Sequence, residues 1–303
     1  MDWKTAISAY KSYLILERSL SGNSVESYSR DVKKLAVFSI DLLQISNVTM
    51  INHEELQVFL VHSNKIGLSD RSQARLVSGL RSFYKFLLLE NIIQDDPTEL
   101  LESPKLSRKI PDFLTSEEIN AVLASVDLSH AQGHRNRAIL ETLYSCGLRV
   151  SELLDLKISN YFPHLGYLRV IGKGNKERIV PIGSEAIKYN EIYLSSIRNH
   201  LRIKDDFRDY LFLNRRGRKL SRVMIFHIVK KAVSDASIDK VVSPHTFRHS
   251  FATHLVEGGA DLKSIQDMLG HESITTTEIY THLDTQYLKD TILLYHPRHT
   301  SVQ

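Results

Sequence analysis

The chain has 303 residues, of which 42% are hydrophobic and 24% are charged, and it contains a single cysteine. This composition is typical of a globular protein, and one cysteine excludes an internal disulfide. No apolar run approaches the roughly 20 residues of a membrane-spanning helix, and charges among the first thirty residues argue against a signal peptide. We therefore expect a cytoplasmic protein with no membrane segment. At about 150 residues per domain, the length predicts two domains.

The small positive charge is unevenly distributed. The whole chain carries 39 Lys and Arg against 35 Asp and Glu, a formal excess of four. Residues 1–100 hold 11 basic and 12 acidic residues, so the excess lies in residues 101–303, with 28 and 23. Within that part, residues 214–231 contain seven Lys and Arg and no Asp or Glu. This stretch fits a solvated surface and a contact with a phosphate backbone equally well.

The first hundred residues predict helices, because apolar residues recur at intervals of three and four. In the helix expected over residues 69–91, one face collects Leu76, Leu80, Phe83 and Leu87. Arg71 and Arg75 lie one turn apart on a different face. Such a helix can pack on its apolar side and contact phosphate on its basic side, although a solvated surface helix has the same pattern.

Residues 95–112 predict a linker between the domains. Pro97, Pro104 and Pro111 fall in this stretch, which has no apolar period, and proline disfavours helix and strand alike. We place the domain boundary so that the first domain spans residues 1–106 and the second spans residues 107–303. Thr115 followed by Glu118 has the spacing of a capping box and predicts the first helix of the second domain.

The second domain predicts helices and one β-hairpin. Residues 167–171 and 178–182 are rich in strand-forming residues, and the turn-forming residues 172–175 lie between them. Helices are expected over about residues 184–200 and 221–233. Ser243 followed by Pro244 predicts another helix start, because proline at the first helical position loses no hydrogen bond. Gly147 and Gly270 each have the context of a helix end.

Twelve of the fourteen histidines lie after residue 100. His245, Arg248 and His249 have the spacing of one helix face. A zincin would need Glu directly after the first histidine, where this chain has Thr246, and no cysteine pair or carboxylate cluster completes a metal site. We therefore expect no metal site. An arginine beside a histidine points instead to an anionic substrate, because guanidinium makes bidentate contacts with phosphate oxygens.

Three further positions carry suitable chemistry. Arg149 follows the expected helix end at Gly147, and Glu152, three residues later, is placed to hold the Arg149 guanidinium. His271 follows the second expected helix end at Gly270. Tyr280 ends the segment that follows His271. Each of these features alone is common in unrelated proteins.

In combination, these segments resemble the tyrosine recombinase (phage integrase) family, in its Xer branch, along the whole chain. The resemblance rests on GLRVSEL with Arg149, VIGKGNKERIVPIG with Lys173, SPHTFRHSFATHL with His245 and Arg248, LGH with His271, and TTTEIYTH with Tyr280. SVESYSRDVKKL, SPKLSRKIP and the terminal HPR agree with it. One departure is residues 160–165, where aromatic residues replace the more usual polar turn.

The resemblance implies a mainly α fold. Residues 1–106 would form a helical, SAM-like core DNA-binding domain, and residues 107–303 a mainly helical catalytic domain with a small β-sheet. Because no metal or other cofactor is implied, the charge on the phosphate would be stabilised by preorganised cations. The implied catalytic residues are Arg149, Lys173, His245, Arg248, His271 and Tyr280.

Each implied catalytic residue has a role that fits its chemistry. Arg149 and Arg248 would clamp the phosphate. Tyr280 would be the nucleophile that forms a 3′-phosphotyrosyl intermediate. His245 and His271 would accept the tyrosine proton or hydrogen-bond the phosphate. Lys173 near the hairpin turn would protonate the departing 5′ oxygen, with Lys176 as the alternative.

The expected partner is duplex DNA, enclosed by the two domains. Phosphate contacts would supply the affinity, and we name Arg71, Arg75, Arg215 and Arg222 as candidate DNA contacts. By resemblance, the protein would resolve chromosome dimers at cell division, in a synaptic tetramer with a related, XerC-like recombinase. A DNA translocase would be the regulator, and the C-terminal residues 287–303 would contact a neighbouring subunit.

Three alternatives stay open at this point. An integrase of a phage or mobile element keeps the chemistry, but such enzymes often carry an additional arm-binding domain before the first helix. A DNA-binding architectural protein would form no covalent adduct. A metal-dependent nuclease would lose its activity in chelator.

Overall fold

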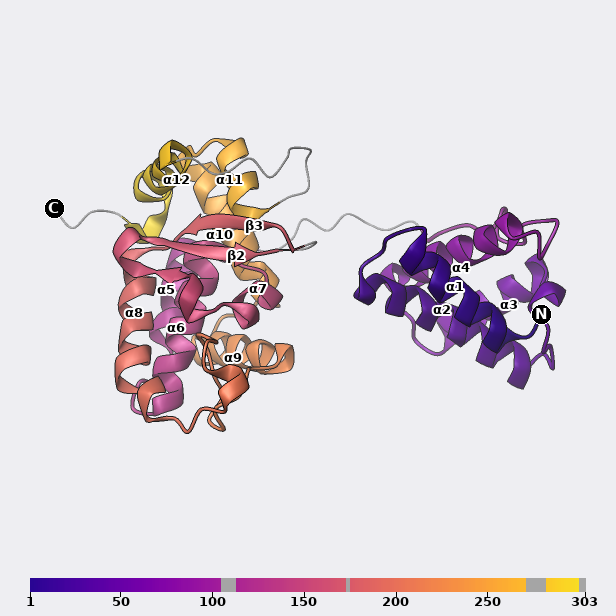
Figure 1. The fold of residues 1–303 in the computed structure, drawn as a ribbon, viewed down its shortest axis with the longest axis horizontal. Helices are drawn as coiled ribbons and strands as arrows, with labels where there is room; N and C mark the ends of the chain where they lie inside the picture. The colour runs from indigo at the N-terminus through magenta and orange to yellow at the C-terminus, as the bar shows by residue number, and fades with distance from the viewer. Residues whose placement is uncertain (105–112, 173–174, 271–281, 300–303) are drawn as a thin grey trace. The chain divides into compact units, whose positions relative to one another are not determined.

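The structure, a computed structural model, describes residues 1–104, 113–172, 175–270 and 282–299. The chain forms two compact units, Met1–Lys109 and Ile110–Gln303, each with its own hydrophobic core (Figure 1). The predicted boundary between residues 106 and 107 lies outside the described residues and stays a prediction. None of the described helices is both long and apolar enough to cross a membrane.

The first unit is helical, as the apolar periodicity predicts. Its helices are α1 (Trp3–Leu16), α2 (Gly22–Asp41), α3 (His53–Lys65) and α4 (Asp70–Leu89). The four apolar residues expected on one face of α4 are all buried in the core of this unit. Asn52 begins α3 with a capping box, because its side chain accepts from the amide of Glu55 and the Glu55 carboxylate accepts from the Asn52 amide.

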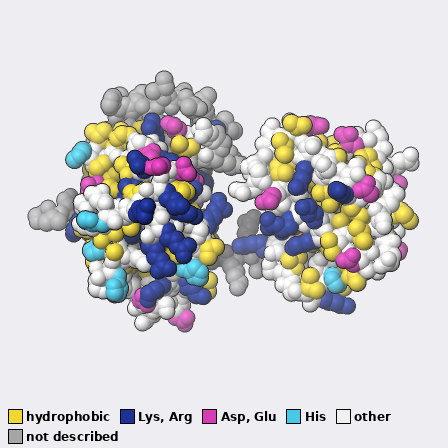
Figure 2. Space-filling model, turned by 60° about the horizontal axis from the view of Figure 1, so that its bottom comes forward, with side chains coloured by type: hydrophobic (Ala, Val, Ile, Leu, Met, Phe, Trp, Pro, Cys, Tyr) yellow, Lys and Arg dark blue, Asp and Glu magenta, His cyan; other side chains and the backbone are white. Residues whose placement is uncertain are grey.

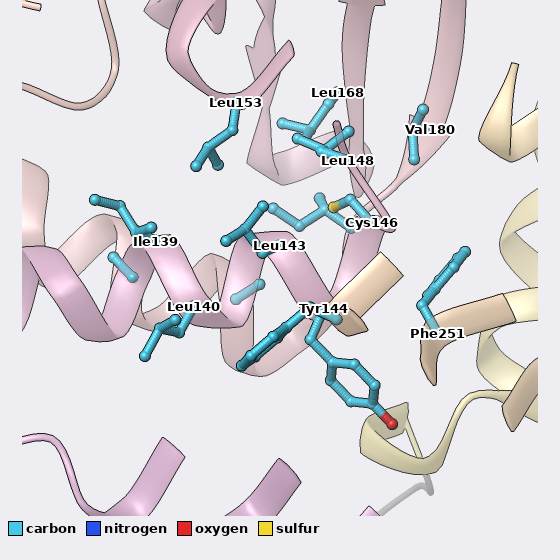
Figure 3. Packing of buried hydrophobic residues seen from close by; sticks show 14 of the residues in the cluster. Ile139, Leu140, Leu143, Tyr144, Cys146, Leu148, Leu153, Leu168, Val180 and Phe251 are labelled. Atoms are coloured by element: carbon cyan, nitrogen blue, oxygen red, sulfur yellow. The ribbon is translucent and has the colours of Figure 1, made fainter. Parts of the chain in front are cut away.

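The second unit is mainly helical. Its helices are α5 (Ser116–Ala124), α6 (Ala131–Cys146), α7 (Val150–Asp155), α8 (Ser184–Ser196), α9 (Arg222–Asp235), α10 (Pro244–Gly258), α11 (Leu262–Leu269) and α12 (His282–Tyr295). The expected capping box of Thr115 and Glu118 is confirmed at the start of α5. Helix α6 supplies much of the core, where Leu143, Tyr144 and Cys146 pack with Leu148 and Phe251 (Figure 3).

The predicted hairpin is confirmed, with a third strand added. β2 (Tyr167–Ile171) pairs antiparallel with β3 (Glu177–Pro181), and β1 (Tyr161–Phe162) pairs with the other edge of β2. The aromatic residues that depart from the usual polar turn thus form the short edge strand β1. Buried positions alternate with more exposed ones along β2 and over the first four residues of β3, as in a half-buried sheet.

The ends of three helices lie at the candidate functional site. Gly147 ends α6 and Gly270 ends α11, each in the left-handed conformation, with φ of +56° and +63°. Ser243 caps α10 by accepting from the amide of Thr246, and Pro244 is the first helical residue. The sequence expectation is confirmed at all three positions.

The C-terminal residues that the structure describes pack on their own unit. Leu288 and Ile292 of α12 are buried in its core. Beyond α12, Arg298 donates hydrogen bonds to the side chains of Asn120 (2.7 Å) and Glu141 (2.7 Å). Glu141 is fully buried and also receives Nε of Arg137 at 2.9 Å. Arg298 therefore connects the segment after α12 to the buried face of α6.

Candidate active site

An arginine cluster surrounds one buried carboxylate, that of Glu152 on α7. Arg149, just before α7, donates its backbone amide to Oε2 at 2.8 Å and its Nη1 to Oε1 at 2.9 Å. Arg178 of β3 donates Nη1 to Oε1 at 2.8 Å and Nη2 to Oε2 at 2.9 Å. Nη1 of Arg248 on α10 lies 3.9 Å from Oε2. Three guanidinium groups thus share one carboxylate, which leaves the cluster positively charged.

The arginine cluster also binds the C-terminal end of α11. Three consecutive carbonyl oxygens accept hydrogen bonds there, each from a different arginine. The Met268 oxygen accepts from Arg178 Nε (2.8 Å), the Leu269 oxygen from Arg248 Nη2 (2.6 Å), and the Gly270 oxygen from Arg149 Nη2 (3.1 Å). Carbonyls at a helix C-terminus have no partner within the helix and carry partial negative charge, so cations are favoured there.

The predicted pairing of Arg149 with Glu152 is confirmed, and the two proposed phosphate clamps, Arg149 and Arg248, lie in one cluster. Their exposure differs: the Arg149 side chain is 41% exposed, whereas that of Arg248 is 6% exposed. Burial, and then the charge of Arg149, lower the pKa of Arg248 to about 10. Arg248 is therefore still charged at neutral pH.

The other proposed catalytic residues are placed as follows. His245 is exposed, on the first turn of α10 and three residues before Arg248. Lys173, His271 and Tyr280 lie outside the described residues. Lys176, the alternative proton donor, is exposed and directly precedes β3. Its carbonyl accepts a hydrogen bond from the amide of Gly172 at 2.8 Å.

Sequence reasoning did not single out Arg178. Its side chain is 6% exposed, and it pairs in register with Val170, whose side chain is buried. A charged residue at an inward position of a strand is the signal that could have identified it, because such a charge needs partners inside the protein.

The four predicted DNA-contact residues are all exposed. Arg71 and Arg75 lie on α4 in the first unit, where Nη1 of Arg75 donates to Ser27 Oγ (2.7 Å) and to buried Asp31, both on α2. Arg215 and Arg222 lie in the second unit, and Arg222 is the first residue of α9.

Basic side chains also gather around Arg215. It lines a surface hollow of about 700 Å³ together with Arg202, Ile203, Lys204, Asp205 and Arg216. Figure 2 shows Lys and Arg gathered into a patch on one face of each unit. Among the residues that the structure describes, no group of three His, Cys, Asp or Glu side chains is arranged to hold a metal ion.

The counter-charge at Glu152 leads to a prediction about stability. Burial opposes ionisation of Glu152, but the hydrogen bonds and charge of Arg178, and then Arg149, lower its pKa below 4.5. Glu152→Gln is expected to reduce the free energy of unfolding by about 3–5 kcal/mol, because buried guanidinium groups lose their counter-charge. Urea unfolding at neutral pH measures the change.

The lowered pKa of Glu152 also predicts how the stability difference changes with pH. A carboxylate with a lowered folded pKa contributes its full stability above the ordinary value of 4.5 and loses it as the pH falls through the folded pKa. The difference in the free energy of unfolding between the unaltered chain and Glu152→Gln should therefore be constant above pH 4.5 and decrease below it. Glu177→Gln is the control, because the Glu177 side chain is 54% exposed and pairs with exposed Arg169 at 3.9 Å. A Glu152→Gln loss no larger than that of the control would contradict the prediction.

Comparison with known proteins identifies the relatives of this chain. The Phage integrase family profile matches residues 112–287, and the profile of the phage integrase N-terminal SAM-like domain matches residues 7–91. Tyrosine recombinase XerD of Staphylococcus saprophyticus is 42% identical over 294 residues, covering 97% of this chain and 99% of that protein. XerD of Staphylococcus aureus strain N315 is 42% identical over 295 residues, with the same coverage.

Solved structures with the same fold include recombinases bound to DNA. The XerH recombinase in a post-cleavage complex with a palindromic difH substrate has a TM-score of 0.70 and 25% identity, covering 91% of this chain and 81% of that one. A lambda integrase dimer bound to a COC′ core site has a TM-score of 0.70 and 19% identity, covering 92% and 100%, and shows the fold alone. The expected mainly helical fold with a SAM-like first domain is confirmed.

Proposed function

Because this chain belongs to the phage integrase family and is a site-specific tyrosine recombinase, which cleaves and rejoins DNA, we propose that Tyr280 is its nucleophile and that Arg149 and Arg248 bind the phosphate. Within the Xer branch, the resemblance favours XerD over XerC, in agreement with the relatives found. The observation that carries the proposal is the cluster in which three guanidinium groups share the carboxylate of Glu152.

The excess positive charge suits the reaction. Attack on a phosphodiester builds negative charge on the nonbridging oxygens, and cations already fixed in place need no rearrangement when that charge appears. The Arg149 side chain, 41% exposed, has room to contact a phosphate from solvent. Arg248 adds a buried positive charge. The orientation of its guanidinium group is fixed by hydrogen bonds to the carbonyls of Gly147 (2.7 Å) and Leu269 (2.6 Å).

The proposed reaction is a reversible transesterification. The Tyr280 oxygen attacks the phosphorus and passes its proton to His245, His271 or solvent. The bond from phosphorus to the 5′ oxygen breaks, and Lys173, or Lys176 in its place, protonates that oxygen. The 3′-phosphotyrosyl bond conserves the energy for ligation by another 5′ hydroxyl. Exchange of strands between two duplexes follows when that hydroxyl comes from the partner duplex.

The biological role we propose is the resolution of chromosome dimers at cell division. The full-length similarity to XerD supports this role. A related, XerC-like recombinase would complete a synaptic tetramer on two duplexes, with a DNA translocase as regulator, and a chromosomal substrate agrees with the expected cytoplasmic location. The exposed Arg71, Arg75, Arg215 and Arg222 are proposed to contact the DNA backbone.

A trapping experiment tests the proposal. Purified protein is incubated in chelator with a duplex library that carries a nick beside each candidate site, so that the released fragment diffuses away and the adduct persists. We expect a covalent protein–DNA adduct, with the DNA-linked peptide mapping to residue 280 by mass spectrometry. Sequencing of the trapped duplexes gives the target site. DNA binding without an adduct, both alone and with an added XerC-type partner, would contradict the proposal.

A further inference from the structure

Arg178 is the member of the arginine cluster that the proposed reaction does not use. It is buried, and all three of its guanidinium nitrogens donate to the protein. Nη1 and Nη2 bind the two oxygens of Glu152 at 2.8 and 2.9 Å, and Nε binds the carbonyl of Met268 at 2.8 Å. Its side chain is 6% exposed and holds both oxygens of Glu152, whereas Arg248, equally buried, lies 3.9 Å from Glu152 and is held by backbone carbonyls. Arg178 joins β3 to both α7 and the end of α11.

Two glycines lie against the Arg178 guanidinium. A side-chain carbon at Gly172 would lie 3.4 Å from its Nη1 and 3.8 Å from Oε1 of Glu152. A side-chain carbon at Gly270 would lie 3.1 Å from the same Nη1 and 3.2 Å from its Cζ, closer than most side chains tolerate. In the sequence, Gly172 directly precedes Lys173, and Gly270 directly precedes His271. Arg178 thus lies beside the residue that precedes each of two proposed catalytic groups.

We propose that Arg178 is a positioning residue, which fixes the Glu152 carboxylate, the base of the Lys173 hairpin and the end of α11 relative to one another. The inference rests on the proposed function, since it assigns Arg178 to the arrangement of those catalytic groups. Its effect on the phosphate passes through Glu152 to Arg149, because Arg178 and Arg149 both donate to Oε1 of Glu152. Arg178 is therefore expected to influence the rate of cleavage without contributing to DNA affinity.

Lysine cannot replace this arginine. A planar guanidinium makes two parallel bonds to a carboxylate while Nε donates in a third direction, whereas an ammonium is a point charge on a flexible stem. Arg178→Lys keeps the charge but loses the bidentate contact with Glu152 or the bond to Met268. The variant therefore separates geometry from charge.

The first measurement is single-turnover cleavage of the trapped duplex over a range of DNA concentrations. We expect Arg178→Lys to lower the maximal rate at least about 10-fold, because small displacements of catalytic groups are costly, and to leave the half-saturating DNA concentration unchanged within about 2-fold. Arg198→Lys is the matched control. Arg198 is also a buried arginine that donates to backbone carbonyls, those of Arg208 (2.6 Å) and Tyr210 (2.9 Å). A maximal rate reduced no more than in Arg198→Lys would overturn the proposal.

A second measurement does not depend on cleavage. Hydrogen exchange of the free protein should become at least about 10-fold faster at the end of α11 and in residues 175–177 of Arg178→Lys, and should remain unchanged there in Arg198→Lys. Unchanged exchange in Arg178→Lys would overturn the positioning role even if the unaltered chain formed no adduct. Absence of an adduct in the unaltered chain, both without and with the XerC-type partner, contradicts the proposed function but not the positioning role, so the two failures are distinguishable.

A double-mutant cycle tests whether Arg178 acts through Glu152. If it does, the rate loss in the combined Arg178→Lys and Glu152→Gln variant will be smaller than the product of the two separate losses. Losses that multiply would show independent action and would overturn the proposal. Thermal unfolding of each variant, with assays below the lowest melting temperature, ensures that folded proteins are compared.

Discussion

Tyr280→Phe is expected to bind the selected duplex as tightly as the unaltered chain and to form no covalent adduct. Phenylalanine keeps the ring but removes the hydroxyl, so no oxygen remains at this position to attack the phosphorus. The loss should therefore be complete rather than graded. A denaturing gel measures the adduct, and a mobility-shift titration on the same duplex measures binding.

Tyr287→Phe is the matched control for this experiment. Tyr287 lies on α12 and is 55% exposed, and its hydroxyl donates to Asp261 at 3.0 Å, on the cap of α11. Tyr287→Phe removes one tyrosine hydroxyl from the same part of the sequence but leaves the hydroxyl of Tyr280, the proposed nucleophile. Adduct formation by Tyr280→Phe, or its loss in Tyr287→Phe alone, would show that the nucleophile has been assigned to the wrong residue.

Arg248→Ala has the second large expected effect, on both rate and stability. The single-turnover cleavage rate should fall at least about 100-fold, because a preorganised cation next to the developing charge is lost. The substitution also leaves the carbonyls of Gly147 and Leu269 without the hydrogen bonds of 2.7 and 2.6 Å that Arg248 donates. Unpaired buried acceptors should lower the free energy of unfolding by about 2 kcal/mol or more.

Arg198→Ala separates these two effects. It likewise removes a buried arginine from backbone carbonyls of the same unit, so a similar loss of stability is expected. Arg198 contacts no member of the arginine cluster in the hydrogen bonds that the structure describes, and its maximal cleavage rate should be retained. Cleavage by Arg248→Ala within about 3-fold of the Arg198→Ala rate would exclude a direct role for Arg248 in the reaction.

The sequence was most informative where neighbours in the chain are also neighbours in space. Arg149 and Glu152 are three residues apart at the cap and first turn of one helix, so their pairing was predictable from their separation in the sequence. The starts of α5 and α10 and the glycine ends of α6 and α11 were also predictable, because capping depends on residues within one turn. Side-chain chemistry, together with the resemblance of five short segments that carry six catalytic candidates, sufficed to indicate the family.

The arrangement of the candidate site depended on contacts between distant parts of the chain. Arg149 and the Gly270 carbonyl are 121 residues apart, and Arg178 and the Met268 carbonyl are 90 residues apart. Similarly, the exposed face of α4 identified Arg75, but only the packing of α2 against α4 revealed that Asp31 binds it. Periodicity shows which face of an element is buried, but it does not show which face of another element covers it. The sequence therefore determined most of the helices and the hairpin, together with the residues that we propose carry the chemistry, because both follow from short-range patterns. Tertiary packing decided that three arginines meet around Glu152 at the end of α11.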